Sequence, residues 1–135
     1  MLTVVTGPPC GGKSTYIKNN AQLGDIVIDM DEIAKALVFG EVGNHDYSDS
    51  VRAVARAARK GAVKQAVIVS QGNRLGVWII HTDPSVEDRN AYRVANAKFV
   101  ECSPGLQVCL KRLKDRPLVN QLKVEKHIRD YYAVR

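Results

Sequence analysis

Short apolar runs alternate with longer amphipathic segments along the chain. Four runs have the length and composition of buried strands, and they lie in the segments LTVVTG, DIVIDMD, GVWIIHTDP and KFVECSPG. The segments between and after them predict helices, in KSTYIKNNAQL, DEIAKALVF, PSVEDRNAYRVANA, SPGLQVCLKRLK and QLKVEKHIRDYYAV. Buried strands that alternate with helices indicate an α/β fold, in which a parallel sheet of about four strands carries helices on both faces.

Residues 48–70 can be interpreted in two ways. The end of this segment, AVIVS, has the composition of a strand. The segment as a whole nevertheless has two distinct helical faces. The apolar face consists of Val51, Val54, Ala55, Ala58, Ala62, Ala66 and Val69, and the basic face consists of Arg52, Arg56, Arg59, Lys60 and Lys64. This pattern predicts one long helix to about residue 70, with a strand at residues 66–70 as the alternative.

Capping residues mark the expected ends of two later helices. Ser85 precedes one helix, and Asp88 three residues later approximates a capping box. Ser103 is expected to cap the next helix, with Pro104 at its first position. The residues of that helix expected to face inward are Leu106, Cys109, Leu110 and Leu113. The segment DRPLVN, residues 115–120, is expected to separate it from the last helix.

Length and composition fit a single domain that spans residues 1–135. No apolar run approaches the ~20 residues of a membrane span, and the start MLTVVTG has no signal-peptide pattern. Cys10, Cys102 and Cys109 show no paired spacing, and the histidines form no zinc pattern with them. We therefore expect a reducing, cytoplasmic environment.

The net charge of +6 is unevenly distributed along the chain. Residues 1–49 hold three basic and seven acidic residues, whereas residues 50–82 hold six basic residues and no acid. Residues 98–135 hold nine basic and four acidic residues. A segregated basic surface favours a polyanionic partner such as DNA or RNA, and the alternative is an ordinary solvated helix face.

A glycine-rich motif follows the first predicted strand and opens the first predicted helix. It has the pattern G-x-x-x-x-G-K-[ST] and consists of Gly7, Pro8, Pro9, Cys10, Gly11, Gly12, Lys13 and Ser14. Glycines let backbone N–H groups converge on phosphate oxygens, and the helix N-terminus adds a partial positive charge. Lys13 can reach the β- and γ-phosphates, Ser14 can ligate Mg²⁺, and Thr15 can contact the α-phosphate. The motif therefore predicts binding of ATP or another NTP with Mg²⁺.

Two carboxylates are expected at the carboxyl edge of the sheet, where ligands of parallel sheets bind. Asp31 follows the second strand, where it can accept the proton of an attacking hydroxyl, and the alternative is that it only caps the next helix. Asp83 ends the third strand and can either approach Mg²⁺ or initiate a turn with the proline that follows. Arg112 and Arg116 lie one helical turn apart, where they can stabilise a transferring phosphoryl group or belong to a solvated face.

Together these features resemble the small P-loop kinases typified by bacteriophage polynucleotide 5′-hydroxyl kinases. The resemblance is carried by GPPCGGKST, IDMDEI, WIIHTDPSVEDR and LKRLKDRP, and it spans nearly the whole chain. The first segment is specific for NTP binding, whereas each of the others alone is a weak signal. The resemblance implies a P-loop NTPase or kinase fold with a short C-terminal lid.

The resemblance also implies roles for individual residues. Lys13 and Ser14 match the phosphate-binding and metal-binding residues of the family, and Asp31 matches its general base. Arg116 and Arg112 match the lid arginines. The family's acid after the third strand corresponds to Asp83.

One position departs from the family pattern. The family often has an arginine three residues after the base, which contacts a phosphate of the acceptor. This chain has Ala34 at that position, followed by Lys35. Either the acceptor differs, or another residue such as Arg52 or Arg56 makes this contact.

From these residues and the resemblance we expect an enzyme. The expected function is an ATP-dependent phosphotransferase that moves the γ-phosphoryl group to a hydroxyl of a nucleic acid. The first expected acceptor is a polynucleotide 5′-OH, and the second is a hydroxymethylated base in DNA. A kinase of a small molecule such as a nucleoside or sugar is the first alternative. A regulatory NTP-binding module is the second.

Overall fold

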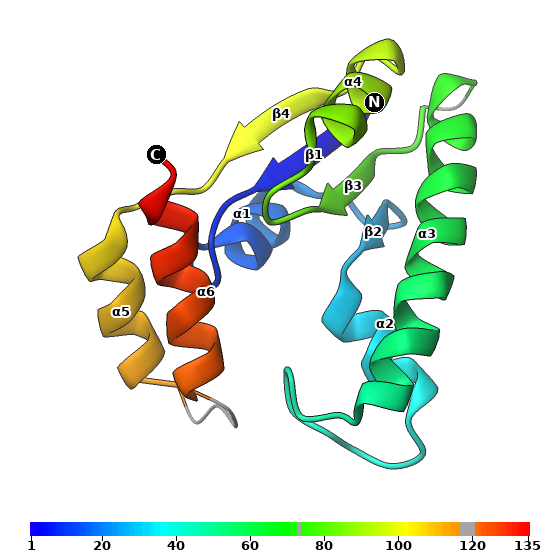
Figure 1. Cartoon of the computed structure of the whole chain (residues 1–135). Helices are drawn as coiled ribbons and strands as arrows, with labels where there is room; N and C mark the ends of the chain where they lie inside the picture. The colour runs from blue at the N-terminus through cyan, green and yellow to red at the C-terminus, as the bar shows by residue number, and fades with distance from the viewer. Residues whose placement is uncertain (73, 117–120) are drawn as a thin grey trace.

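A four-stranded parallel sheet forms the centre of the protein (Figure 1). This computed structural model describes residues 1–72, 74–116 and 121–135. The strands are β1 (Leu2–Thr6), β2 (Ile26–Ile28), β3 (Val77–Ile80) and β4 (Lys98–Glu101), and their order in the sheet is β2-β3-β1-β4. All neighbouring pairs are parallel, which confirms the α/β fold predicted from the alternating pattern.

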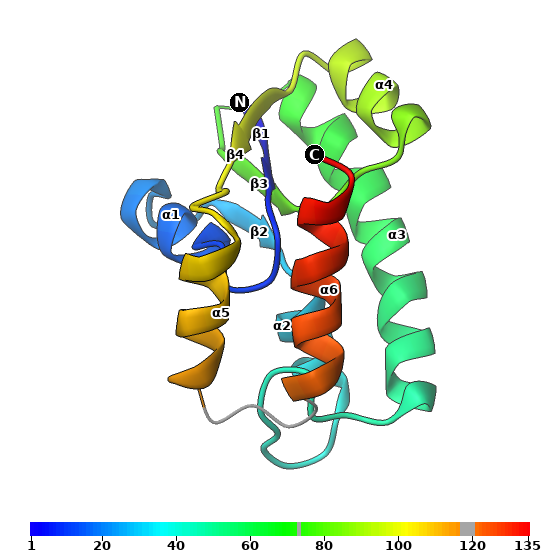
Figure 2. The ribbon, with the colours of Figure 1, turned by 60° about the vertical axis from the view of Figure 1, so that its left-hand side comes forward.

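Helices cover both faces of the sheet and its carboxyl edge. They are α1 (Lys13–Asn20), α2 (Met30–Leu37), α3 (Asp49–Gln71), α4 (Val86–Val94), α5 (Leu106–Lys114) and α6 (Gln121–Ala133). Figure 2 shows α1 on one side of the sheet and both α3 and α4 on the other. The helices α5 and α6 lie side by side beyond the carboxyl ends of β1 and β4 (Figures 1 and 2).

The main hydrophobic core lies between the sheet and the helices α3 and α4. Val4 and Ile79 are fully buried on this face, and Tyr92 of α4 packs against the same cluster. Because successive side chains of a strand point to opposite faces, the fully buried Val5 faces the other side. There α1 contributes the buried Ile17. The sheet is therefore buried on both faces at its centre, as its continuous apolar strands predict.

The ambiguous segment is helical throughout. The helix α3 extends from Asp49 to Gln71, so the strand alternative for residues 66–70 is wrong. Ser48 caps its start, because the Ser48 hydroxyl accepts a hydrogen bond from the N–H of Val51 at 3.2 Å.

The predicted orientation of α3 is correct in part, because Ala55 and Ala66 of the predicted apolar face are buried, but several other positions differ. Val54 is 56% exposed, and Ala58 and Ala62 also lie on the solvent side. Arg52 and Arg59, for which the pattern predicts a solvent-facing position, are instead half-buried toward the rest of the protein. Alanine is abundant on both sides of this helix and does not define a face, whereas an arginine can bury its aliphatic stem and still place its charged group beside polar atoms. Only Arg56, Lys60 and Lys64 of the predicted basic face are exposed.

Of the two predicted serine caps, one is confirmed and one is wrong. The Ser85 hydroxyl accepts a hydrogen bond from the N–H of Asp88 at 3.0 Å and caps α4. Ser103 does not cap α5, because Gly105 occupies the capping position with a φ of 111°. The Ser103 hydroxyl instead donates to the Tyr132 hydroxyl of α6 at 3.1 Å.

The same tyrosine explains the start of α5. Its hydroxyl accepts a hydrogen bond from the N–H of Gly105 at 3.0 Å, and Pro104 stays outside the helix. The predicted inward residues of α5 are confirmed, since all of them belong to the cluster between α5 and α6 or pack against it: Leu106, Cys109, Leu110 and Leu113.

Two further predictions concern the connection after α5 and the membrane. The break predicted at residues 115–120 includes positions 117–120, which lie outside the described residues, and α5 ends at Lys114. Among the helices that the structure describes, none is long and apolar enough to cross a lipid bilayer.

Candidate active site at the carboxyl edge of the sheet

The glycine-rich loop, residues 7–14, connects the carboxyl end of β1 to α1. Gly7 and Gly12 have positive φ angles of 140° and 96°, a region that side-chain-bearing residues rarely adopt. A Cβ atom at Gly7 would overlap the carbonyl oxygen of Cys102, the residue that follows β4. A Cβ atom at Gly11 would crowd the same oxygen. Glycine is therefore required where the loop presses against the neighbouring strand.

Lys13 folds back over this loop. Its ammonium group donates hydrogen bonds to the carbonyl oxygens of Gly7 and Pro8, both at 2.7 Å. Burial lowers the pKa of Lys13 to about 8, and nearby charges such as that of Asp29 oppose this shift. An ammonium group has three donors, so one of them remains for a ligand. A partly desolvated cation at the first turn of α1 is well placed for an anion.

Ser14 and Thr15 are exposed in the first turn of α1. Hydroxyl oxygens of this kind suit Mg²⁺, which keeps several waters and takes few protein ligands when it binds with phosphates. Within residues 1–72, 74–116 and 121–135, no group of three or more His, Cys, Asp or Glu residues could hold a metal ion alone. The donor set fits a magnesium ion that is bound chiefly through a phosphate ligand.

Both candidate lid arginines lie at the glycine-rich loop. The Arg112 guanidinium donates to the carbonyl oxygen of Cys10 at 3.1 Å. Arg112 and Arg116 also line an open pocket of about 630 Å³ beside the loop. Its other lining residues are Gly11, Gly12, Thr15, Tyr16, Asn19, Cys102, Ser103 and Pro104. The pocket is thus bounded by the loop, by α1, by the connection after β4 and by α5.

Cys10 links the loop to the α5–α6 pair. It has a left-handed φ of 62°, and its side chain is buried in the cluster that also contains Cys109 and Ile128. Burial raises the pKa of the Cys10 thiol, although the charges of Arg116 and Lys13 oppose the shift. The thiol is therefore protonated and packed, which is a structural role. Pro8 is fully buried and Pro9 is half-buried in the same loop.

The two aspartates that follow β2, Asp29 and Asp31, have different roles in the structure. Asp29 is the cap of α2, because its Oδ1 accepts a hydrogen bond from the N–H of Asp31 at 3.0 Å. Burial raises the pKa of Asp29. Asp31 therefore does not cap the helix, and that alternative is wrong. The signal that could have identified Asp29 was its place directly before the helix.

Asp31 points toward the loop between α2 and α3, where it is held by residues that the sequence analysis missed. The Tyr47 hydroxyl donates to Asp31 Oδ1 at 2.7 Å, and the N–H of His45 donates to the same oxygen at 3.2 Å. The His45 imidazole Nε2 lies 3.6 Å from the other oxygen, Oδ2. The Asp31 side chain is only 20% exposed.

Arg52 lies beside this group. Its guanidinium is 4.9 Å from the centroid of the Tyr47 ring, and its Nε is 3.9 Å from an Asp49 carboxylate oxygen. That Nε atom is buried and has no hydrogen-bond partner among the described residues. Further along α3, Arg59 donates at 3.0 Å to the carbonyl oxygen of Ile80, at the carboxyl end of β3. Arg59 therefore reaches the carboxyl end of β3, whereas Arg52 contacts Tyr47 and Asp49 near the start of α3.

Asp83 follows β3, but other residues already engage it. Its carboxylate pairs with Arg135 at 2.9 Å and with Arg89 at 3.5 Å. Arg135 also stacks on the Tyr131 ring, 3.5 Å from its centroid. These contacts fasten the end of α6 to the connection after β3. A metal-binding role for Asp83 stays a prediction.

The chain matches no protein-family model and has no significant match among curated proteins. The fold itself is an α/β fold with a four-stranded parallel sheet. Its function must therefore be inferred from the motif and from the geometry around it.

Proposed function

We propose that the protein is a P-loop kinase that transfers the γ-phosphoryl group of ATP, with Mg²⁺, to a hydroxyl group of a nucleic acid. The observation that carries this proposal is the arrangement around residues 7–14. Arg112 of α5 and Arg116, which follows α5, flank the loop on one side. Asp31 and Arg52 belong to the helices that come after β2, whose carboxyl end lies at the same edge of the parallel sheet. The strand β2 lies two places from β1, a distance of about 10 Å at the usual strand spacing.

The loop and its surroundings supply the donor side of this reaction. Backbone N–H groups at the start of α1 would bind phosphate oxygens, and Lys13 would leave its two carbonyl partners for the phosphates. Ser14 would hold the Mg²⁺ ion, which neutralises charge on the phosphates. Arg112 and Arg116 would stabilise the charge that moves toward the leaving diphosphate. The pocket of about 630 Å³ that Arg112 and Arg116 line beside the loop would receive the nucleoside.

Asp31 and Arg52 supply the acceptor side. As the acceptor oxygen bonds to the γ-phosphorus, its proton passes to the Asp31 carboxylate and the bond to the diphosphate breaks. The Arg52 side chain is 20% exposed, so the outer N–H groups of its guanidinium are suited to an anionic group of the acceptor near the reacting hydroxyl. Arg52 would therefore contact a phosphate of the acceptor, the role that the resemblance gives to an arginine at the position of Ala34.

The choice between acceptors depends on the surface of α3. Arg56, Lys60 and Lys64 are exposed on a segment without acidic residues, which favours a polynucleotide. The inward position of Arg52 and Arg59 reduces this exposed basic surface. A small phosphorylated acceptor would satisfy Arg52 equally well, so a small-molecule kinase is the second candidate.

The deciding experiment offers γ-labelled ATP with 5′-OH oligonucleotides, hydroxymethylated DNA, nucleosides and sugars. We expect label on a nucleic acid, with loss of transfer in Lys13→Ala and normal transfer in Lys18→Ala, which changes an exposed lysine of the same helix. Label on small molecules alone would select the second candidate. ATP hydrolysis that no acceptor stimulates would instead indicate a regulatory NTP-binding module.

A further inference from the structure

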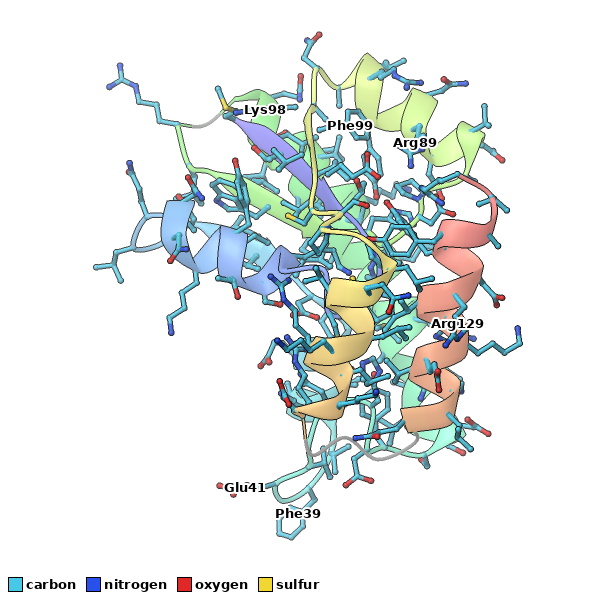
Figure 3. The ribbon with its side chains drawn as sticks, turned by 90° about the vertical axis from the view of Figure 1, so that its left-hand side faces the viewer. Phe39, Glu41, Arg89, Lys98, Phe99 and Arg129 are labelled. Carbon is cyan, nitrogen blue, oxygen red and sulfur yellow. The ribbon has the colours of Figure 1, made fainter. Side chains whose placement is uncertain are left out.

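The connection between α2 and α3, residues 38–48, reaches back from the periphery to Asp31. Figure 3 shows Phe39 and Glu41 at its outer tip, far from the sheet. Its later part returns and places His45 and Tyr47 against the Asp31 carboxylate. This later part, residues 45–47, supplies the two hydrogen bonds from the connection to the candidate base.

The two contacts converge on a single oxygen. Asp31 Oδ1 accepts hydrogen bonds from the Tyr47 hydroxyl at 2.7 Å and from the His45 N–H at 3.2 Å. The His45 imidazole Nε2 lies 3.6 Å from Oδ2, which is longer than a hydrogen bond. Among the described residues, Oδ2 therefore accepts no hydrogen bond, while Oδ1 is fully engaged.

The backbone and side chains of residues 45–47 are arranged for this contact. His45 has a left-handed φ of 62°, a conformation that is unfavourable for a residue with a side chain. That conformation directs its N–H to Asp31. The Tyr47 ring is covered by the Arg52 guanidinium at 4.9 Å. Burial and the hydrogen bond to Asp31 raise the pKa of Tyr47 to about 12, so its hydroxyl remains a donor at neutral pH.

We propose that Tyr47 and the backbone of His45 are positioning residues that clamp Asp31 through Oδ1 and leave Oδ2 as the oxygen that receives the acceptor's proton. This inference rests on the proposed function, because it gives Asp31 the role of general base. It assigns the connection between α2 and α3 to the catalytic machinery. Fixing the carboxylate fixes the direction from which the hydroxyl must approach.

The first test compares two tyrosine variants in the transfer assay with γ-labelled ATP and a 5′-OH oligonucleotide. Tyr47→Phe should lower kcat by roughly tenfold to a hundredfold, with little change in the KM for ATP. Tyr131→Phe is the matched control, since it removes another tyrosine–carboxylate hydrogen bond, of 2.6 Å to Glu101, outside the site. Equal effects of the two substitutions would overturn the proposal.

A double-mutant cycle separates positioning from a general loss of structure. If Tyr47 acts through Asp31, then Tyr47→Phe should have almost no further effect on kcat in an Asp31→Asn background. If the two substitutions instead lower kcat by independent factors that multiply in the double variant, the clamp is contradicted. Should Asp31→Asn reduce turnover while Tyr47→Phe does not, the clamp fails and the kinase proposal stands. Wild-type turnover in Asp31→Asn would instead show that Asp31 is not the general base.

A spectroscopic measurement tests the contact without any acceptor. In protein labelled with ¹³C at the tyrosine ζ carbon, the Tyr47 phenol should titrate well above the pKa of a free tyrosine. Asp31→Asn should lower that pKa, because it removes the negative charge beside the hydroxyl. The resonances of the other tyrosines serve as internal controls. An unchanged Tyr47 titration would overturn the proposal even if every acceptor tested were inactive.

Discussion

ATP binding at alkaline pH should be coupled to uptake of a proton by Lys13. Burial lowers the pKa of this lysine from 10.5 to about 8 in the free protein. Phosphate groups beside its nitrogen would favour the charged form and return the pKa toward that of an exposed lysine. Lys13 should therefore be largely neutral at pH 9 in the free protein and protonated in the complex.

The two pKa values determine the size of this effect. If the pKa rises from about 8 to about 10.5, binding takes up about 0.9 proton at pH 9 and about 0.1 proton at pH 7. The apparent affinity for ATP should then be about tenfold weaker at pH 9 than at pH 7. The phosphates of ATP contribute little at pH 9, because the last pKa of a phosphate group is about 6.

Titration calorimetry at pH 9, in two buffers with different ionisation enthalpies, measures the uptake directly. Lys13→Met should abolish it, whereas Lys18→Met, which changes an exposed lysine of the same helix, should not. An uptake below about 0.3 proton in the wild-type protein would refute the link between Lys13 and the phosphates. So would the same uptake in Lys13→Met. Where that variant binds too weakly for calorimetry, the wild-type value decides.

Four other variants have expected outcomes. Asp31→Asn should leave ATP affinity nearly unchanged and lower kcat by roughly 10²–10⁴, measured at saturating ATP; weakened affinity with full turnover would contradict the base role. Arg116→Ala should lower kcat more than it weakens ATP binding, and an unchanged kcat would return this residue to a solvated surface. Arg56→Glu with Lys60→Glu should flatten the salt dependence of oligonucleotide binding, by about 0.7 in log–log slope for each phosphate that the protein no longer neutralises; a small acceptor would show no such change. Gly7→Ala places a methyl group against a backbone carbonyl and should lower the melting temperature, and unchanged melting would show that the loop can relax.

The strands and most helices were predictable from the sequence because local patterns determine them. Val4 and Val5 point to opposite faces of β1, so both can be buried only in a sheet that is covered on both faces. Ser85 lies directly before its helix, so its capping role depends on neighbouring residues alone. The helix at residues 66–70 was predictable because the amphipathic pattern extends over many turns.

The errors arose where distant contacts decided the outcome. The cap of α5 is replaced by the Tyr132 hydroxyl, which is 27 positions away from Gly105 in the sequence. In the same way, Tyr47 contacts Asp31 across 16 positions, beside the left-handed backbone of His45, and no local sequence pattern indicates this contact. The orientation of α3 was predicted only in part, because alanine is compatible with both core and surface, and Arg52 was placed on the wrong side.

Because of Cys10, the glycine-rich loop and the α5–α6 pair can be exchanged between proteins only together. Its side chain belongs to the hydrophobic cluster between these helices, while its carbonyl oxygen accepts the Arg112 hydrogen bond. A chimera that takes α5 and α6 from another protein must therefore also match the residue at position 10. A larger side chain there would push apart α5 and α6 and displace Arg112. Recombination at the boundary before α5 would break a hydrogen bond between residues 102 positions apart, so the two segments should be exchanged together.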